Sequence, residues 1–218
     1  MSDIFALRYQ VYCKERRFLL PENYPDGTER DAYDRYAVHF AAYNRDSRVV
    51  GGARLVLPRG PKPFPFESHC ETFDDFVLPP RISAAEISRL VVHEDYRHKV
   101  ENTVIGFTSD LVERMEGIPF DISYTHIERR SPSGRILMGL YKKIYLYSKQ
   151  EGITDWYAAM ERPLLRLLKQ THFPFIQIGP ETDYYGAVAM YTMSVRGFEQ
   201  ALFKHQPNLY RWFTRRTR

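Results

Sequence analysis

Two short segments that read as buried strands carry charged side chains where apolar residues are expected. The segment "EISRLVV" contains Glu86 and Arg89, and "GGARLVL" contains Arg54. Burying a carboxylate or a guanidinium is costly unless it is paired with an opposite charge. Alternation along a strand puts Glu86 and Arg89 on opposite faces, unless a β-bulge brings them together. These residues are candidates for a buried ion network or for a reactive site.

The N-terminal part of the chain supplies possible partners for these charges. Arg8 interrupts an apolar helical pattern in "LRYQVYCKERRF", and Asp31 and Asp34 follow in the loop "ERDAYD". Taken singly, Arg8 would extend its charge to the surface and the two aspartates would be turn residues. Together with Glu86, the aspartates are the carboxylates that would neutralise Arg54. A structural ion network and a functional site both fit this pattern.

A possible anion site precedes the longest apolar helical pattern. In "SPSGRIL", Ser131, Ser133, Gly134 and Arg135 stand at the expected start of a helix. Free N–H groups and the positive end of the helix dipole favour a phosphate at such a position. Serine and glycine there are more often simple caps, so the motif alone is weak evidence for a ligand.

Other chemistries find no support in the sequence. There is no G-x-S-x-G, no Walker loop and no G-x-G-x-x-G, and His93, Glu94 and His98 lack the spacing of a zinc site. We therefore expect no metal site. The tail "YRWFTRRTR" mixes aromatic residues with arginines, but such tails are usually solvated ends, and we expect no nucleic-acid partner.

Composition restricts the class of protein. The chain has 218 residues, 44% of them hydrophobic, which predicts one globular domain over residues 1–218 with a substantial core. Two cysteines indicate a reducing compartment, and we expect a cytoplasmic protein without a leader or membrane span. The net charge of +4 favours an acidic partner without specifying which one.

Hydrophobic periodicity predicts a mixed α/β (α+β) fold, because helices and strands alternate irregularly along the chain. The order begins with a helix, two strands with a tight turn and a third strand. A segment from residue 93 to about residue 130, with a less regular pattern around one helix, comes next. A long helix, a strand, a helix, two strands and a basic C-terminal helix complete the chain. The expected helices cover residues 3–20, 104–115, 131–152 and 162–170, and the expected strands cover 37–44, 49–57, 86–92, 153–160, 173–179 and 187–195.

Taken in order, these motifs resemble the bacterial acyl-homoserine-lactone synthases and the related long-chain N-acyl amino acid synthases. The family pattern is an arginine and an aromatic residue on the first helix, E-x-D-x-x-D in a loop, an arginine in a strand, and then E-[LI]-S-R. The matching positions here are Arg8, Tyr12, Asp31, Asp34, Arg54, Glu86 and Arg89. "RYQVYC-x-E-x-x-F" followed by a proline-rich loop is similar to the acyltransferases associated with PEP-CTERM/exosortase systems.

The resemblance implies a GNAT-like acyltransferase fold, with a mixed, mostly antiparallel sheet flanked by helices. It implies transfer of a long-chain acyl group from the 4′-phosphopantetheine thioester of acyl carrier protein to the amino group of an amino acid or similar small amine. No bound cofactor is expected. The chain departs from the lactone synthases at "RRFLLPENY", where they carry a tryptophan, and by an insertion at about residues 93–134.

Roles for the matching residues follow from the resemblance. Glu86, Arg54 and Arg89 are expected to be catalytic, with Glu86 receiving the proton of the amine, while Arg8, Tyr12, Asp31 and Asp34 are expected to contact the substrate. The phosphopantetheine arm is expected near Ser131, Ser133, Gly134 and Arg135, and the acyl tail near Trp156, Met160 and Phe173. The alternatives are lactone synthesis from S-adenosylmethionine and a non-catalytic protein that binds acyl carrier protein or lipid.

Overall fold

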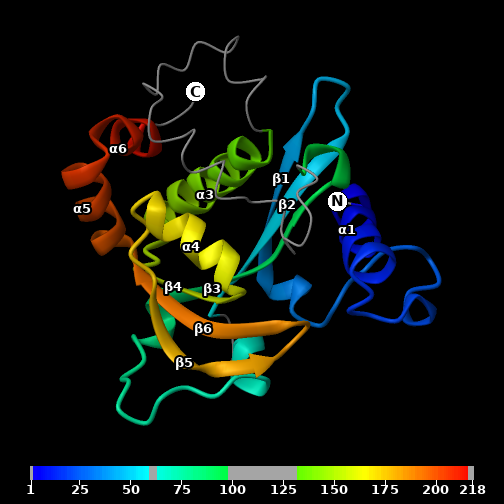
Figure 1. Cartoon of the computed structure of the whole chain (residues 1–218), viewed down its shortest axis with the longest axis horizontal. Helices are drawn as coiled ribbons and strands as arrows, with labels where there is room; N and C mark the ends of the chain where they lie inside the picture. Colours follow the sequence, from blue (N-terminus) through cyan, green and yellow to red (C-terminus); the bar gives the residue numbers. More distant parts are fainter. Residues whose placement is uncertain (1, 59–62, 98–131, 216–218) are drawn as a thin grey trace.

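A six-stranded sheet organises the protein (Figure 1). The computed structural model describes residues 2–58, 63–97 and 132–215. The strand order is β1-β2-β3-β4-β6-β5, and every neighbouring pair is antiparallel except β3 and β4. The sheet is therefore mixed and mostly antiparallel, as predicted. The strands are β1 Ala37–Tyr43, β2 Val49–Val56, β3 Ala84–Val92, β4 Asp155–Met160, β5 Ile176–Asp183 and β6 Ala187–Ser194.

The helices lie on both faces of this sheet. The α-helices are α1 Ser2–Tyr9, α3 Pro132–Glu151, α4 Arg162–Gln170, α5 Val195–His205 and α6 Pro207–Thr214, and a π-helix spans Gln10–Glu15. Short 3₁₀ turns occupy Pro21–Asn23, Asp34–Tyr36, Pro65–Ser68, Arg81–Ser83 and Glu94–Tyr96. In the described ranges 2–58, 63–97 and 132–215, no helix is long and apolar enough to cross a bilayer.

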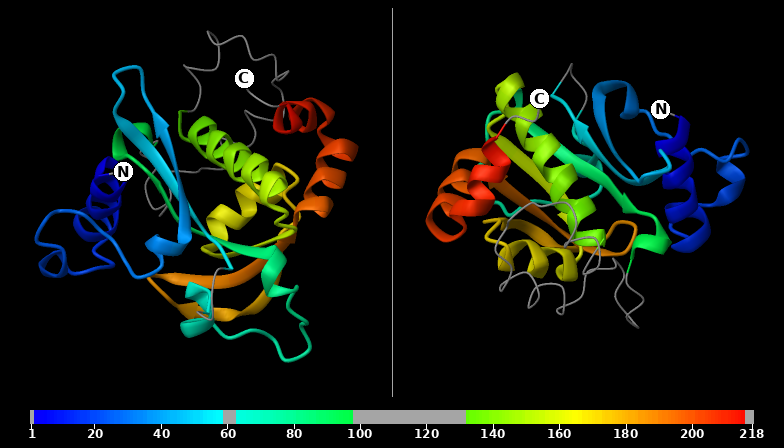
Figure 2. Two further views of the ribbon diagram at one scale, coloured as in Figure 1. Left: turned by 180° about the vertical axis from the view of Figure 1, so that it is seen from behind. Right: turned by 90° about the horizontal axis from the view of Figure 1, so that it is seen from above.

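Two adjacent glycines in β2 let helices approach both faces of the sheet. A Cβ at Gly51 would stand 2.3 Å from the side chain of Ile136 in α3, and a Cβ at Gly52 would stand 2.9 Å from Ile4 in α1. Neighbouring residues of a strand face opposite sides, so α1 and α3 pack on opposite faces of the β1–β2 hairpin (Figure 2). Any larger residue at Gly51 would displace α3.

The parallel pair β3–β4 is short, and this shapes the middle of the molecule. Its register joins only Ala84–Glu86 to Asp155–Tyr157. Parallel strands need a crossover connection, and α3 is part of it. This helix ends at Glu151, and Gly152 follows it with a φ of 72°. Beyond Glu86 and Tyr157 the two strands no longer pair with each other. The sheet therefore divides at its centre into β1–β3 and β4–β6.

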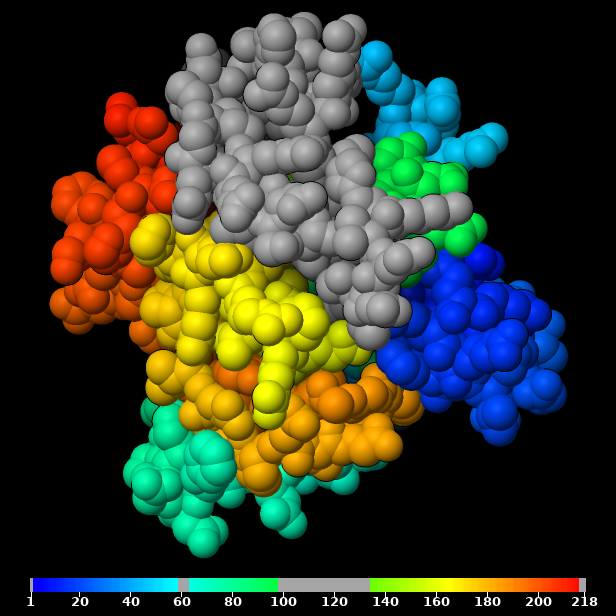
Figure 3. All heavy atoms as spheres, in the orientation of Figure 1, coloured from blue at the N-terminus to red at the C-terminus, as the bar shows by residue number. Residues whose placement is uncertain are grey.

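The larger core fills the α3 side of the sheet. It is rich in aromatic residues: Phe173, Phe198 and Phe213 contact one another with ring centroids 4.5–5.9 Å apart, and Trp156 packs on Phe198. These residues join α5 and α6 to β4. Figure 3 shows α5 and α6 (red) on the side of the molecule away from α1 (blue), and the teal loop beside β5 and β6 at one end.

Several predicted boundaries were wrong for identifiable reasons. The expected helix over residues 3–20 becomes α1 followed by the π-helix, and it ends before Arg17, which has a φ of 55°. The expected single C-terminal helix is two helices, because Pro207 starts a new one. The expected strand at residue 173 starts at Ile176, after Phe173 and Phe175, which are fully buried.

Part of the predicted architecture falls outside the residues that the structure describes. The helix expected over residues 104–115 and most of the insertion at about 93–134 lie outside the described residues. The assignment of residues 1–218 to one domain also stays a prediction.

Candidate active site

The charged residues singled out from the sequence form a network beside α1. Arg8 in α1 donates from Nε to Glu29 and from Nη1 and Nη2 to Asp34, at 2.7 and 3.2 Å. Its side chain is only 1% exposed. The expectation that Arg8, taken singly, extends its charge to the surface is therefore wrong.

The loop that carries the acids is folded by its own hydrogen bonds. The backbone N–H of Glu29 donates to the carbonyl of Phe5, which ties the loop to α1. Asp31 Oδ1 accepts from the N–H of Tyr33, and Asp34 Oδ2 accepts from the N–H of Asp31. The aspartates are turn residues and ion-pair partners at once, because a carboxylate has enough lone pairs for both.

Arg54 and Arg89, which lie in strands β2 and β3, complete the network. Arg54 in β2 donates from Nε to Ser88 Oγ at 3.0 Å and from Nη1 to Asp31 and Asp34 at 2.6 and 3.0 Å. Arg89 in β3 donates to both Glu29 oxygens at 3.2–3.3 Å and to Asp31 at 3.1 Å. Each acid thus bridges two arginines.

A β-bulge brings Arg89 to the same face as Arg54. Gly52 is opposite Val91 and Arg54 is opposite Ser88, so β3 has one more residue than β2 over this stretch. Arg89 has a φ of 51°, a left-handed conformation that is uncommon outside glycine. Of the two arrangements that strand alternation left open, the structure contains the bulge.

The electrostatics of this network are balanced. Burial would raise the pKa of Asp34, but Arg8 and Arg54 outweigh it and lower that pKa to about 2. Burial would lower the pKa of Arg89, but Glu29, Tyr12 and Asp31 outweigh it and raise that pKa. In this network three arginines and three acids pair with one another, so their opposite charges are equal in number.

Glu86 behaves differently, although it is close to the same residues. It is 1% exposed, and its Oε2 accepts the backbone N–H of Phe66 at 3.0 Å. Burial raises the pKa of Glu86 to about 7, against the lowering effects of the Phe66 N–H, Arg54 and Arg89. The balance that the sequence left open is thus decided by desolvation. A carboxyl that titrates near neutral pH is suited to accepting and releasing a proton.

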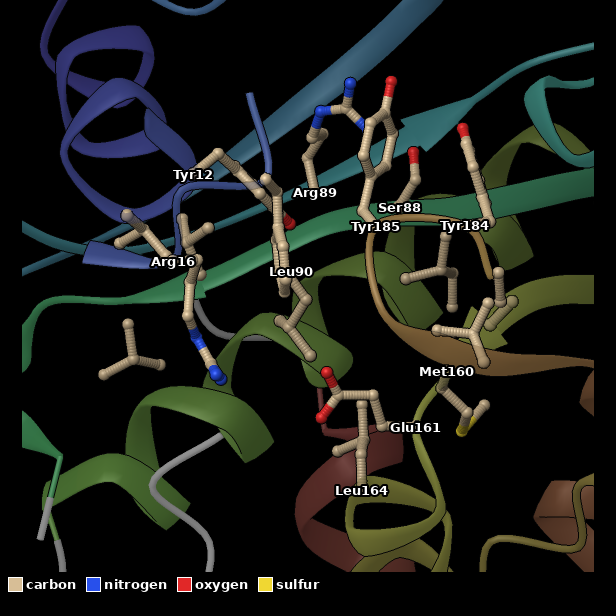
Figure 4. Close-up of a pocket in the computed structure, with 18 of the residues that line it drawn as sticks. Tyr12, Arg16, Ser88, Arg89, Leu90, Met160, Glu161, Leu164, Tyr184 and Tyr185 are labelled. Carbon is tan, nitrogen blue, oxygen red and sulfur yellow. The ribbon is translucent and has the colours of Figure 1, made fainter. Parts of the chain in front are cut away.

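A pocket opens where β3 and β4 separate. Figure 4 shows residues from β3, from the end of β4, from the π-helix and from the β5–β6 turn around it. Its charged and polar lining includes Glu86, Ser88 and Arg89, and the ring of Tyr12 lies 5.3 Å from the Arg89 guanidinium. Its apolar lining includes Ile87, Leu90, Val91, Val92, Tyr141, Ala158, Met160, Leu164 and Val188. The pocket therefore joins an ionisable end to an apolar wall.

Not every residue expected at the site lines this pocket. Met160 does, but Trp156 and Phe173 lie in the aromatic core, where the Trp156 indole donates to Ser148 Oγ at 2.9 Å. Their expected contact with an acyl tail was therefore wrong. The sequence favoured a tail-binding role for Trp156 and Phe173 because aromatic residues are common both in cores and in apolar pockets.

The expected phosphopantetheine residues are only partly described. Ser131 lies outside the described residues, and Ser133 is described only as a residue of the first turn of α3. Gly134 is buried in that turn and Arg135 is half-buried beside it. The α3 N-terminus lies near the end of β3, since Gly51, which is paired with Val92, contacts Ile136.

Sequence reasoning missed three residues of the site. Glu29 is fully buried and joins Arg8 to Arg89, although the E-x-D-x-x-D pattern includes it. Ser88 holds Arg54, and alternation already placed it on the face of Glu86. Tyr185 covers Arg89 from the β5–β6 turn at 5.5 Å, and no sequence signal pointed to it.

Comparison with known proteins gives a family match for part of the chain. Residues 7–107 match the family model described as "Acetyltransferase (GNAT) domain". No curated protein matches the chain in sequence.

Three solved structures show the extent of the likeness. TofI, in a ternary complex with an inhibitor and MTA, has a TM-score of 0.63 and 14% identity, covering 95% of this chain and 91% of its own. BjaI, a CoA-dependent acyl-homoserine lactone synthase with SAM and isopentyl-CoA, has a TM-score of 0.58 and 19% identity over 93% and 80%. The AHL synthase LasI has a TM-score of 0.60 and 14% identity over 93% and 87%.

At these identities the likeness is one of fold. The protein has the GNAT-like fold that the sequence predicted, with a mixed sheet between helices that opens at its centre. The family match over residues 7–107 supports an acyltransferase of GNAT type. The association with PEP-CTERM systems stays a prediction.

Proposed function

We propose that the protein is an N-acyltransferase that moves a long-chain fatty acyl group from acyl carrier protein to the amino group of an amino acid or similar small amine. The observation that carries this proposal is Glu86, a buried carboxyl with a pKa of about 7 in the pocket where β3 and β4 separate. The GNAT match and fold supply the reaction class.

The proton transfer follows from the state of Glu86. The amine nitrogen attacks the thioester carbonyl, a C–N bond forms, and the C–S bond breaks as the tetrahedral intermediate collapses. The Glu86 carboxylate, directly or through one water, accepts the proton that the amine loses, and that proton is then available to the departing thiolate. A carboxyl with its ordinary pKa of 4.5 would be a weaker base for this step than one near 7.

The separated strands suit stabilisation of the oxyanion. β3 pairs with β4 only as far as Glu86, so the β4-facing backbone groups of Ile87 to Val92 have no partner in that strand. Backbone N–H groups on this edge are donors held rigidly by the β2–β3 ladder. Such fixed donors stabilise a developing oxyanion without needing to reorganise.

The apolar wall suits the acyl chain. Ile87, Leu90, Met160, Leu164 and Val188 follow the ionisable end of the pocket. Each methylene removed from water contributes about 0.8 kcal/mol, so a chain lying along this wall gains affinity with its length. The net charge of +4 suits the docking of an acidic carrier protein, and this contribution should weaken with salt.

The network is less suited to gripping a carboxylate than we expected from the sequence. Nε, Nη1 and Nη2 of Arg8 donate to Glu29 and Asp34. Nε and Nη2 of Arg89 donate to Glu29, and Nη2 also donates to Asp31. Within the described residues, Arg54 Nη2 is buried without a hydrogen-bond partner. We propose that the network orders the loop and β3, and that an acceptor in the pocket meets Arg89, because Arg89 lines the pocket and Arg54 does not.

Two measurements test the proposal. Mass spectrometry of extracts from cells that express the protein should reveal N-acyl amino acids, whereas N-acyl homoserine lactones would indicate the alternative reaction with S-adenosylmethionine. The purified protein should release free thiol from acyl carrier protein thioesters in the presence of the acceptor that the extracts identify.

A matched pair of variants tests the role of Glu86. Glu86→Gln should lower the turnover number by about 10²–10⁴-fold, the usual contribution of a general base. The exposed Glu181→Gln should leave it unchanged. Near-normal turnover in a folded Glu86→Gln protein would refute the proton-acceptor role, and thioester binding without turnover in the wild type would favour a non-catalytic binder.

A further inference from the structure

The pocket has a second charged region at the end away from Glu86. Arg16, from the segment after the π-helix, Arg97, from the segment after β3, and Glu161, directly after β4, all line it. Figure 4 shows the side chains of Arg16 and Glu161 pointing toward one another, with Leu90 between them and Ser88. This region belongs to the diverging ends of the two parallel strands.

Among the described residues, Arg16 has no ion-pair partner in this region, whereas Arg97 has one. Arg97 is neutralised by an ion pair with Glu15. Arg16 is half-buried and stacks on Phe18 at 5.7 Å, but it makes no ion pair within 4.0 Å to any residue that the structure describes.

The surroundings of Arg16 leave its charge incompletely compensated. Burial lowers the pKa of Arg16, and the positive charge of Arg97 adds to this effect. Glu161 opposes it, with smaller contributions from Tyr12 and Glu15. Burial likewise raises the pKa of Glu161. A half-buried guanidinium without a carboxylate partner is costly, and it is suited to binding an anionic ligand.

The position of Arg16 indicates which anion it meets. Glu86 is paired with Tyr157, and Glu161, toward which Arg16 points in Figure 4, comes four residues after Tyr157. A strand rises about 3.3 Å per residue, so Tyr157 and Glu161 are separated by roughly 13 Å. The carboxylate of an α-amino acid is attached to the carbon that carries its amine. An acceptor with its amine at Glu86 therefore cannot place its carboxylate at Arg16. The acyl donor has its phosphate separated from its thioester by the whole pantetheine arm.

We propose that Arg16 binds the phosphate of the donor's 4′-phosphopantetheine arm. This inference rests on the proposed function and adds a position for the donor phosphate on the wall of the pocket opposite α4. Glu161 holds the Arg16 guanidinium electrostatically in the empty pocket and repels the phosphate when the arm enters. Gly134 and Arg135, the described part of the expected donor site, lie near the same end of β3, so they and Arg16 would contact one arm from two sides.

The test compares two non-cleavable thioether analogues, decanoyl-4′-phosphopantetheine and decanoyl-pantetheine, by calorimetry on the whole protein. The wild type should bind the phosphorylated arm at least about tenfold more tightly, as expected for a hydrogen-bonded charge pair. Arg16→Gln should lose this preference while binding decanoyl-pantetheine as the wild type does. Glu161→Gln should keep or increase it.

The neighbouring Arg17→Gln is the matched control, since Arg17 is exposed and does not line the pocket. It should keep the full preference for the phosphorylated arm. Thermal unfolding of each variant checks that the fold is intact.

Three results would overturn the inference. One is equal binding of the two arms by the wild type, and another is an Arg16→Gln protein that retains the preference. The third is an Arg16→Gln protein whose KM rises for a carboxylated acceptor but not for its methyl ester. Failure of the wild type to bind either arm would instead refute the donor site of the proposed function itself, and this inference with it.

Discussion

The two charged regions of this protein differ in whether their buried charges are paired with opposite charges. In the network of Arg8, Glu29, Asp31, Asp34, Arg54 and Arg89, every group has a partner of opposite charge. In the pocket, Glu86 and Arg16 have no ion-pair partner within the described chain, and burial shifts both of their pKa values toward the neutral form.

The difference separates a structural role from a chemical one. The pKa of Asp34 is lowered to about 2, so its charge is constant near neutral pH and it cannot exchange protons. The pKa of Glu86 is raised to about 7, so it changes charge in the range where an enzyme works. On the proposed function, the protein therefore uses paired charges to fix α1, the acidic loop and β3, and the unpaired Glu86 beside them for reactivity.

Breaking the paired region should have the largest effect on stability. Glu29→Ala would leave Arg8 and Arg89 short of a buried partner and should destabilise the fold by about 3–5 kcal/mol, seen as a lower midpoint in urea. Glu181→Ala, which removes an exposed ion pair with Arg162, should cost less than about 1 kcal/mol. Equal losses in the two variants would mean that the network does not hold the fold.

Removing the charge of Glu86 should stabilise the fold, in contrast to the loss expected for Glu29→Ala. In the unfolded chain Glu86 titrates near its ordinary pKa of 4.5, and in the folded chain near 7, so between these values the folded state binds more protons. The stability of the wild type should fall as pH rises through this window. Glu86→Gln, which cannot ionise, should be more stable than the wild type by about 3 kcal/mol at pH 8.

The same comparison at low pH provides the control. Below pH 4.5 the carboxyl is neutral in both states, and the two proteins should unfold at similar urea concentrations. A Glu86→Gln protein less stable than the wild type at pH 8 would show that a buried carboxylate at this position is stabilised by its surroundings, contrary to its raised pKa.

The rate should report the same ionisation. If Glu86 is the base, only its carboxylate form is active, so kcat/KM should rise about tenfold per pH unit below pH 7 and level off above it. Asp34 contributes no change in this range, because Arg8 and Arg54 outweigh the effect of burial and lower its pKa to about 2. A profile that is flat between pH 5 and pH 8 would contradict the assignment.

The smallest expected effect concerns the aromatic cover of Arg89. Tyr12 and Tyr185 place their rings 5.3 and 5.5 Å from its guanidinium. Tyr185→Leu should lose about 1 kcal/mol of stability, and Tyr185→Phe, which keeps the ring, should lose less. Similar losses in both variants would assign the contribution to the hydroxyl and not to the ring.

Much of the fold could be predicted from local pattern. The strand "EISRLVV", the glycine-ended helix after residue 131 and the turn at residues 44–48 all agree with the structure, because each depends on neighbours along the chain. Boundaries failed at Phe173 and at Arg17, where long-range burial and a left-handed residue outweigh periodicity.

The candidate site was predictable in composition but not in arrangement. Arg8, Asp31, Asp34, Arg54 and Arg89 were selected because charges in apolar segments need partners, and the structure brings them together. Local sequence pattern does not decide between a bulge and separate faces for Arg89. That choice depends on the pairing of β3 with β2, which joins residues more than thirty positions apart.

By itself, the sequence determined that three arginines inside apolar segments must be buried together with acids. Only the tertiary structure decided that Glu86 is left out of this pairing while Glu29 is included. The physical reason is that a pKa is set by the solvent and charges around a side chain in space. The sequence lists the charges, but the fold sets the distances between them.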